Sequence, residues 1–245
     1  MLASTRRWSG FRDRFAAMTL ARRDFSLGLV AAGLGSAGLS LPSAAQSGWP
    51  AEGTHYVRLQ QPAAVAAAGK LEVVEFFWYE CPHCNAFEPA LEAWSKKLPA
   101  DVVLRRVPVW FQEVPFASQQ RLFYTLEVLD LSPTLHRKVF AAIHNDRARL
   151  RTPEDMAAFA LKNGADPIRF MTVYSSPEVA TQCQRARQLA EAYKIDAVPA
   201  MGVHGRFYTN GNLANAGQPA NGPAAGNERL LAVVDMLLGR VRKVG

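Results

Sequence analysis

The motif Cys81-Pro82-His83-Cys84 stands where a predicted strand meets a predicted helix. Residues 71–79 before the motif are mostly apolar and strand-forming, a pattern typical of a central strand covered on both faces. Residues 85–98 after it are predicted as a helix. A thiol at the start of a helix lies near unpaired N–H groups and the positive end of the helix dipole. We therefore expect Cys81 to ionise more readily than an ordinary thiol.

Cys84 follows Cys81 by three residues, so the two side chains are neighbours on one turn of the helix. A disulfide between them would close too small a loop to constrain the unfolded chain much. A stabilised Cys81 thiolate also favours the reduced form of the pair. The motif therefore predicts a disulfide donor rather than a structural cross-link.

The N-terminal 45 residues have the pattern of a bacterial export signal. Arg22-Arg23 precedes an apolar run over residues 25–41, and Ser43-Ala44-Ala45 offers a cleavage site before Gln46. The arginine pair resembles a twin-arginine signal. The apolar run is shorter than the roughly 20 residues that a membrane-spanning helix needs. We expect a mature chain of residues 46–245 in the periplasm, an oxidising compartment.

The positive charge of the chain does not indicate a nucleic-acid partner. The formal net charge of +7 falls to +3 once residues 1–45, with six Arg and two Asp, are removed. The remaining Lys and Arg form no long block, so we predict solvated faces instead of a binding surface for nucleic acid.

The first part of the mature chain has the pattern of a parallel α/β unit. Residues 54–59 are predicted as an edge strand, and residues 101–107 as the strand that follows the motif helix. A strand, a helix and a second strand joined by a right-handed crossover make a parallel pair.

The middle of the chain, from 116 to 193, is predicted to be helical. An N-cap residue followed by proline recurs at four places and predicts four helix starts, with a further helix over 117–129. Gly164 is predicted to end one of these helices in the left-handed conformation. The four N-cap residues are Ser132, Thr152, Asp166 and Ser176.

Strands return near the C-terminus, at residues 200–203 and 207–209, joined by a turn at His204-Gly205. Residues 210–227 are rich in Gly, Asn, Ala and Pro and are predicted as a loop. An amphipathic helix over 228–241 ends the chain.

This order of elements resembles the DsbA family of periplasmic thiol oxidases. The resemblance rests also on Glu75-Phe76-Phe77 before the motif and on Val198-Pro199-Ala200 before the second pair of strands. The resemblance covers residues 52–242. It implies a thioredoxin fold, an α/β fold, with an inserted all-helical domain. The implied parts are an export signal over 1–45, a first thioredoxin-like part over 46–115, a helical insertion over 116–193 and a second thioredoxin-like part over 194–245.

The resemblance also implies roles for the motif residues. Cys81 matches the family's exposed nucleophile and Cys84 its buried resolving partner, so the pair would be the redox-active disulfide. His83 matches the histidine that helps to hold the Cys81 thiolate. Glu75 matches a buried glutamate that can relay the proton of Cys84. Glu72, nearby in the same strand, is expected to be a solvated acid.

Substrate contacts are implied on two segments. Val198 and Pro199 match the family's cis-proline loop, which faces the motif and pairs with an extended substrate. Phe87 and Leu91 lie on the same helix face as His83, which borders a peptide groove in the family, although the same spacing also suits a core stripe. Cys183 matches no active-site position and is expected to be a small buried residue. His55, His136, His144 and His204 show no ligand spacing and receive no role.

The function implied is a thiol:disulfide oxidase that donates its disulfide to reduced, unfolded exported proteins. A DsbB-like, quinone-linked membrane oxidase would reoxidise it, and we expect a monomer without cofactor. An isomerase or reductase of the same superfamily is the alternative, but about 25 residues between Gln46 and Leu71 leave no room for a dimerisation domain. A metal-binding or redox-sensing protein is the less favoured reading, because Cys183 alone does not complete a zinc site.

Overall fold

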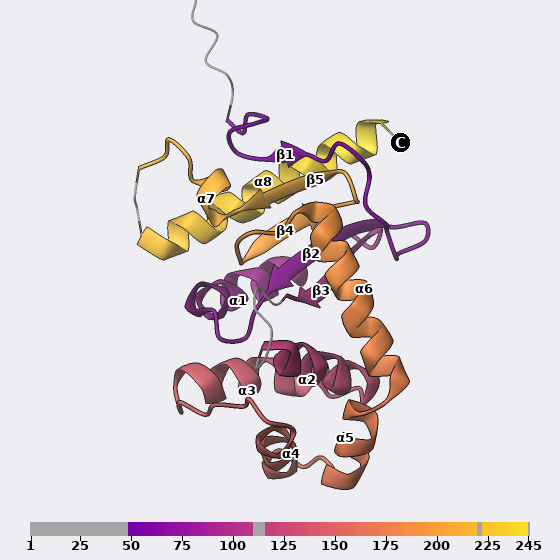
Figure 1. Ribbon diagram of the computed structural model, residues 1–245. Helices are drawn as coiled ribbons and strands as arrows, with labels where there is room; N and C mark the ends of the chain where they lie inside the picture. The colour runs from indigo at the N-terminus through magenta and orange to yellow at the C-terminus, as the bar shows by residue number, and fades with distance from the viewer. Residues whose placement is uncertain (1–48, 110–115, 220–221, 245) are drawn as a thin grey trace, which may run out of the picture. The chain divides into compact units, whose positions relative to one another are not determined.

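The computed structural model describes residues 49–109, 116–219 and 222–244 (Figure 1). All of them belong to one compact unit, residues 45–245. The predicted export signal lies outside the described residues. None of the helices described combines the length and hydropathy that crossing a membrane requires.

Five strands and eight helices make up the described chain. The strands are β1 (Val57–Arg58), β2 (Leu71–Phe77), β3 (Val102–Pro108), β4 (Ala200–Val203) and β5 (Phe207–Asn210). The helices are α1 (Pro82–Ser95), α2 (Phe116–Val128), α3 (Ser132–His144), α4 (Pro153–Lys162), α5 (Pro167–Tyr174), α6 (Pro177–Tyr193), α7 (Gly211–Ala214) and α8 (Gly222–Val244).

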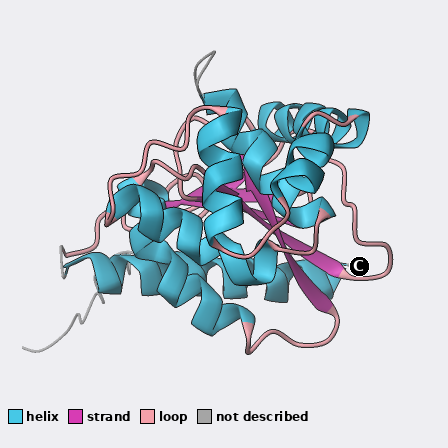
Figure 2. Cartoon of the chain, turned by 90° about the horizontal axis from the view of Figure 1, so that it is seen from below, coloured by secondary structure: helices cyan, strands magenta, loops and turns pink. Residues whose placement is uncertain are grey.

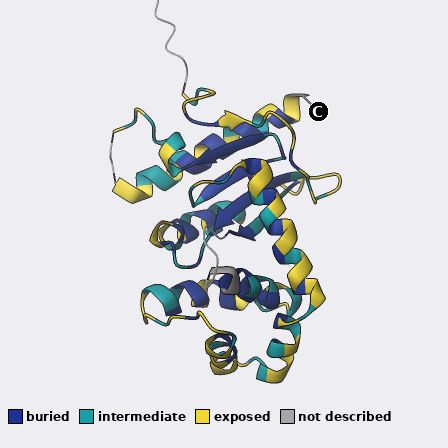
Figure 3. Cartoon of the chain, in the orientation of Figure 1, coloured by how far each residue is buried: buried dark blue, intermediate teal, exposed yellow. Residues whose placement is uncertain are grey.

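The strands form one mixed sheet in the order β1-β5-β4-β2-β3. The predicted parallel pair is confirmed, since β2 and β3 run parallel with Glu75 opposite Arg106. The predicted pairing of the last two strands is confirmed as an antiparallel ladder between β4 and β5. Strand β1 lies at the edge as predicted, although it is only two residues long. The predicted central strand β2 is buried from its second residue onward (Figure 3).

Helices cover both faces of this sheet (Figures 1 and 2). On one face, Val73 of β2 packs in a core with side chains of α1 and α8. On the other face, Val74 and Phe76 pack against the end of α6, with Tyr193 tilted over Phe76 at 5.1 Å between ring centroids. Because side chains alternate along a strand, Glu75 lies on the same face as Val73, toward α1.

Helices α2 to α6 lie between β3 and β4 in the chain and form the helical insertion. Phe77, at the end of β2, contributes to the core of this insertion together with Phe123 of α2 and Phe140 of α3. Helix α6 begins beside α5 and ends against the sheet (Figure 1). The motif region is therefore built by the sheet and the insertion together.

Three of the four predicted N-caps are confirmed. The side chains of Thr152, Asp166 and Ser176 accept hydrogen bonds from backbone N–H groups three residues on, at 2.9–3.2 Å. The prediction for Ser132 is wrong, because Ser132 lies buried inside α3 and Leu131 occupies the cap position without a side-chain bond. Gly164 takes the predicted left-handed conformation, with φ of 88°.

The predicted loop over 210–227 is wrong in part, because it contains α7 and the start of α8. The side chain of Asn210 caps α7 by accepting from the N–H of Leu213 at 2.9 Å. Asn227, in the first turns of α8, donates to the carbonyl of Ala86 in α1 at 3.2 Å. Arg229 donates to the side chain of Asn215. These tertiary contacts outweigh the weak helix propensity of Gly and Asn.

The packing of Tyr193 against β4 leaves no space for a side chain at residue 202. A Cβ atom added to Gly202 would lie 2.4 Å from Cε1 of Tyr193. The ring cannot easily move, because Tyr193 is buried and its hydroxyl accepts a hydrogen bond from the N–H of Gly205 at 2.9 Å.

We therefore expect Gly202→Ala to lower the free energy of unfolding by about 1–3 kcal/mol through overpacking. Gly239→Ala in α8 is the matched control. A Cβ there meets nothing within 4 Å, so the substitution should raise stability by about 0.5–1 kcal/mol. Urea denaturation of both variants measures the difference, and equal effects would contradict the packing described for Tyr193.

Candidate active site at the start of helix α1

Cys81 occupies the N-cap position of α1, as the sequence predicts. Strand β2 ends at Phe77, and Trp78, Tyr79 and Glu80 lead from it into the helix. Only 7% of Cys81 is exposed, and Cys84 is fully buried. Both are free thiols in this structure. Cys81 is therefore the member of the pair that a second molecule can reach.

The surroundings of the two thiols drive their pKa values apart. A hydrogen bond from the Cys84 thiol, the N–H groups of Cys84 and His83, and the charge of His83 together lower the pKa of Cys81 to about 6, against the opposing effect of burial. Burial and the neighbouring Cys81 raise the pKa of Cys84 well above that of a free thiol. One thiol thus ionises near neutral pH while the other keeps its proton.

Val198 and Pro199 lie against the motif, joined by a cis peptide bond as the resemblance implies. The Cys81 thiol donates a hydrogen bond of 3.5 Å to the carbonyl of Val198. Beside this contact is a pocket of about 490 Å³ lined by His83, the 197–199 segment, α7 and the start of α8. His83 is exposed at its edge. The structure thus brings five of the predicted site residues together: Cys81, Cys84, His83, Val198 and Pro199.

Phe87 and Leu91 do not line this pocket. Both are fully buried in the core with Val73 and Leu230, so they cannot contact a substrate in this structure. The predicted groove role is wrong, and the alternative core reading describes them. Side chains of the sheet and of α8 cover this stripe of α1.

Glu75 is fully buried, as predicted, and Arg106 on the adjacent strand is its ion-pair partner, with Nε 3.2 Å from Oε2. Burial, and then the nearby charge of Glu88, raise the pKa of Glu75 well above its ordinary value. The expectation that Glu72 is solvated is wrong. Glu72 is 1% exposed, pairs with Arg105 at 3.1 Å and accepts a hydrogen bond from the N–H of Ala66.

A second buried carboxylate, Glu88 of α1, joins this group. It lies 3.4 Å from Nη2 of Arg106 and 3.0 Å from Nε2 of His136 in α3, and His136 in turn lies 2.9 Å from the hydroxyl of Tyr79. The sequence patterns did not indicate Glu88 or His136 as site residues. Glu88 stands four residues after Cys84 on the same helix, a detectable spacing. His136 lies about 50 residues from the motif, and nothing in the sequence indicates the contact.

The insertion also holds the residues just before Cys81. The side chain of Arg151 pairs with Glu80 through two contacts of 3.0 Å, and Gln119 donates to the same carboxylate. Nε2 of His144 lies 2.8 Å from the carbonyl of Tyr79. His136 and His144, to which the sequence assigned no role, therefore both contact the segment that leads into the motif.

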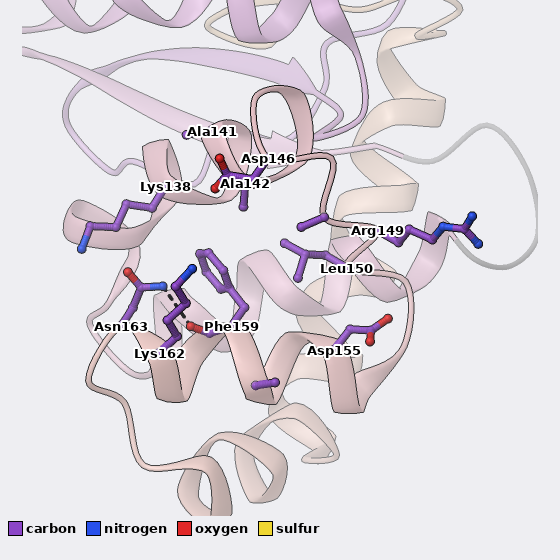
Figure 4. A pocket seen from close by; sticks show the side chains of 12 residues that line it. Lys138, Ala141, Ala142, Asp146, Arg149, Leu150, Asp155, Phe159, Lys162 and Asn163 are labelled. Atoms are coloured by element: carbon purple, nitrogen blue, oxygen red, sulfur yellow. Dashed lines mark hydrogen bonds between the residues drawn. The ribbon is translucent and has the colours of Figure 1, made fainter.

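Cys183 is buried in α6, as expected, and burial raises its pKa to about 11. Among the described residues, no three His, Cys, Asp or Glu side chains are grouped as metal ligands would be. A further pocket of about 650 Å³ lies between α3 and α4, with Leu150 and Phe159 among its apolar lining and Lys138 at its edge (Figure 4). It contains none of the predicted site residues.

Comparison with known proteins agrees with this geometry. The model of the DSBA-like thioredoxin domain matches residues 106–216. The thiol:disulfide interchange protein DsbA of Azotobacter vinelandii is 43% identical over 202 residues, covering 81% of this chain and 92% of the relative. The chain belongs to the DsbA family. DsbA of Bordetella pertussis is 42% identical over 88% of this chain and 96% of its own length.

Solved structures of DsbA proteins share the fold. The crystal structure of Pseudomonas aeruginosa DsbA superposes with a TM-score of 0.72 at 39% identity, covering 79% of this chain and 95% of that one. The chain is thus a thiol:disulfide oxidoreductase with a thioredoxin-like DsbA fold.

The pKa difference between the two thiols leads to a labelling prediction. Iodoacetamide should modify Cys81 of the reduced protein with a rate that is half-maximal near pH 6, because the thiolate is the reactive form. Cys84 and Cys183 should stay unmodified below pH 8, since burial raises both pKa values. Mass mapping of the labelled peptides checks this, with Cys81→Ser as the control. Labelling of Cys84 before Cys81 would contradict the assignment.

A second prediction concerns stability. The folded-state pKa of Cys81 is depressed, so its thiolate stabilises the reduced protein fully above the unfolded pKa, and this gain is lost as pH falls through about 6. Between pH 5 and pH 7.5 the reduced form should gain about 2 kcal/mol relative to the oxidised form. Denaturant unfolding of both redox forms at the two pH values measures it. A difference independent of pH would contradict the depressed pKa.

Proposed function

We propose that Cys81 and Cys84 form the disulfide that this protein donates to reduced, unfolded exported proteins. The observation that carries the proposal is the pKa separation of the two thiols, with Cys81 lowered to about 6 and Cys84 raised. A thiol with a low pKa is a good leaving group and makes the oxidised form of its pair reactive. The periplasm supplies reduced substrates of this kind.

Transfer takes two steps. A substrate thiolate attacks Sγ of Cys81, a new S–S bond forms, and the electron pair of the broken bond goes to Sγ of Cys84, which takes up a proton. A second substrate thiolate then attacks the substrate sulfur and releases Cys81 as a thiolate. Two substrate thiols become one disulfide, and the protein gains two electrons and one proton while the other proton goes to solvent.

Glu75 is proposed to supply the proton that Cys84 takes up. Its carboxyl group is buried and its pKa is raised well above the ordinary value, which favours the protonated form, while in its ionised form it raises the pKa of Cys84. General acid catalysis by such a group contributes typically about 10²–10⁴-fold.

His83, Val198 and Pro199 are proposed to hold the substrate and the Cys81 thiolate. His83 lies at the edge of the 490 Å³ pocket, and its charge is among those that favour the thiolate. The carbonyl of Val198, next to Cys81, is placed to accept from an extended substrate chain. The pocket is the proposed substrate-binding surface in place of Phe87 and Leu91.

Continued activity requires an electron acceptor, because each cycle leaves two electrons on the cysteine pair. We propose that a DsbB-like, quinone-linked membrane oxidase takes them, and that the mature protein works in the periplasm as a monomer. Relatives with the name thiol:disulfide interchange protein DsbA support the exchange reaction that creates the need for such an acceptor.

The test is stoichiometric transfer. Oxidised protein mixed with a reduced, unfolded substrate at equal concentration should give one substrate disulfide per Cys81–Cys84 dithiol formed, because electrons are conserved. Thiol counting and mass spectrometry measure both products. Cys183→Ala should transfer normally, whereas Cys84→Ala, which cannot form the disulfide, should transfer nothing. A reduction potential near that of thioredoxin, with poor transfer, would instead indicate the reductase.

A further inference from the structure

His136 of the helical insertion is the centre of a row of polar side chains that ends at Glu75, whose charge acts on Cys84. Its Nδ1 lies 2.9 Å from the hydroxyl of Tyr79 and its Nε2 lies 3.0 Å from Oε1 of Glu88. Arg106 links Glu88 to Glu75, because its Nη2 lies 3.4 Å from Oε2 of Glu88 and its Nε lies 3.2 Å from Oε2 of Glu75. Glu75, Glu88 and Tyr79 are at most 1% exposed and His136 is 5% exposed, so water does not reach these four groups, whereas 26% of the Arg106 side chain is exposed.

The charges of these polar side chains can balance in two ways. With Arg106 as the one cation, one of the two carboxyl groups must carry a proton, since an uncompensated buried charge is costly. With His136 protonated as well, both carboxylates could be ionised. The position of one proton, on a carboxyl group or on the imidazole, therefore distinguishes the two arrangements.

The contacts of His136 favour the neutral imidazole. Burial holds the pKa of the Tyr79 hydroxyl well above its ordinary value, so the hydroxyl keeps its proton, and among the described residues Nδ1, at 2.9 Å, is the acceptor available to it. Nε2 must then carry the hydrogen that faces Glu88. The rings of Phe77, Phe123 and Phe140 stand edge-on around His136 at 5.1–5.8 Å between centroids, an apolar setting that disfavours an imidazolium ion.

The two carboxyl groups then differ in their donors. Glu88 accepts from Nε2 of His136 through one oxygen and from Arg106 through the other. Among the described residues, neither oxygen of Glu75 has a partner with good hydrogen-bond geometry, although Nε of Arg106 lies 3.2 Å from Oε2. Hydrogen bonds to a carboxylate stabilise its ionised form, so the proton is more stable on Glu75.

The other charged groups near these polar side chains do not reverse the preference for a proton on Glu75. Arg137, on the same helix as His136, disfavours a proton on the imidazole and favours ionised Glu88. Glu127 of α2 acts on Tyr79, where it strengthens retention of the hydroxyl proton.

We propose that His136 is a positioning residue that keeps Glu88 ionised and so leaves the proton on Glu75, the carboxyl group that acts on Cys84. Through this contact the helical insertion determines which of the two carboxyl groups, that of Glu75 or that of Glu88, can supply a proton to the departing Cys84 sulfur. The functional consequence rests on the proposed role of Glu75. The proton positions themselves are independent of it.

The first measurement is made on the reduced wild-type protein. With ¹³Cδ-labelled glutamate, NMR should show one carboxyl group that is protonated at pH 7, and its signal should be missing in Glu75→Gln. ¹⁵N spectra should show His136 neutral, with hydrogen on Nε2. An imidazolium pattern for His136 at pH 7, or assignment of the protonated signal to Glu88, would overturn the proposal.

Variants test the cause. His136→Phe removes the donor to Glu88, so the apparent pKa of Glu88 should rise by about one to two units and that of Glu75 should fall, as expected for a lost hydrogen bond to a charged group. His136→Gln can keep an N–H donor and should restore most of the wild-type titration. His144→Phe, on the same helix but in contact with the carbonyl of Tyr79, should leave both carboxyl groups unchanged.

Unchanged titration of Glu75 and Glu88 in folded His136→Phe would overturn the inference. If that variant does not fold, His136→Gln and the wild-type ¹⁵N spectra decide the question by the same criteria. The stoichiometric transfer assay separates this outcome from the proposed function. Failure of transfer with the expected titrations would reject the oxidase role alone, whereas normal transfer with unchanged titrations would reject the role of His136 alone.

Discussion

Two fully buried carboxyl groups share one guanidinium group, that of Arg106, directly beneath the cysteine motif. A buried charge is tolerated only when it is paired, and one cation cannot fully compensate two anions. Burial and the neighbouring Glu88 raise the pKa of Glu75 well above its ordinary value, which favours a proton on this carboxyl group. Arg106 reaches both acids because β3 lies parallel to β2 and α1 packs over that face. The thioredoxin-like order of strand, helix and strand thus brings the proposed acid, Glu75, and the two thiols into one region.

The two thiols are made unequal by their places on a single helical turn. Cys81 lies at the helix start, where N–H groups and the Cys84 thiol stabilise its anion, and Cys84 lies one turn deeper with no exposure. A relaxed structural disulfide needs no such asymmetry. Disulfide exchange does, because one sulfur must be reached and then leave while the other is protected from solvent.

The helical insertion contributes more than a cover for the motif. Four of its side chains, His136, His144, Arg151 and Gln119, contact Tyr79, Glu80 or Glu88. The segment entering the motif is therefore held from the insertion side, while the carbonyl of Val198 approaches Cys81 from the sheet side. The position of Cys81 depends on both parts of the fold.

The sequence by itself determined the helix starts at Thr152, Asp166 and Ser176 and the place of Cys81 at a helix start, because each depends on neighbouring residues only. It also determined the parallel pair, because a strand, a helix and a second strand that follow one another in the chain favour that pairing. With the family resemblance it also indicated buried Glu75 and the loop at Pro199. Tertiary structure alone decided that Phe87 and Leu91 are core, since α8 covers that face, and that residues 211–214 and 222–227 are helical. It also brought His136 to Glu88, a contact across 48 positions that no local pattern encodes, because only the packed fold excludes the water that would otherwise separate such groups.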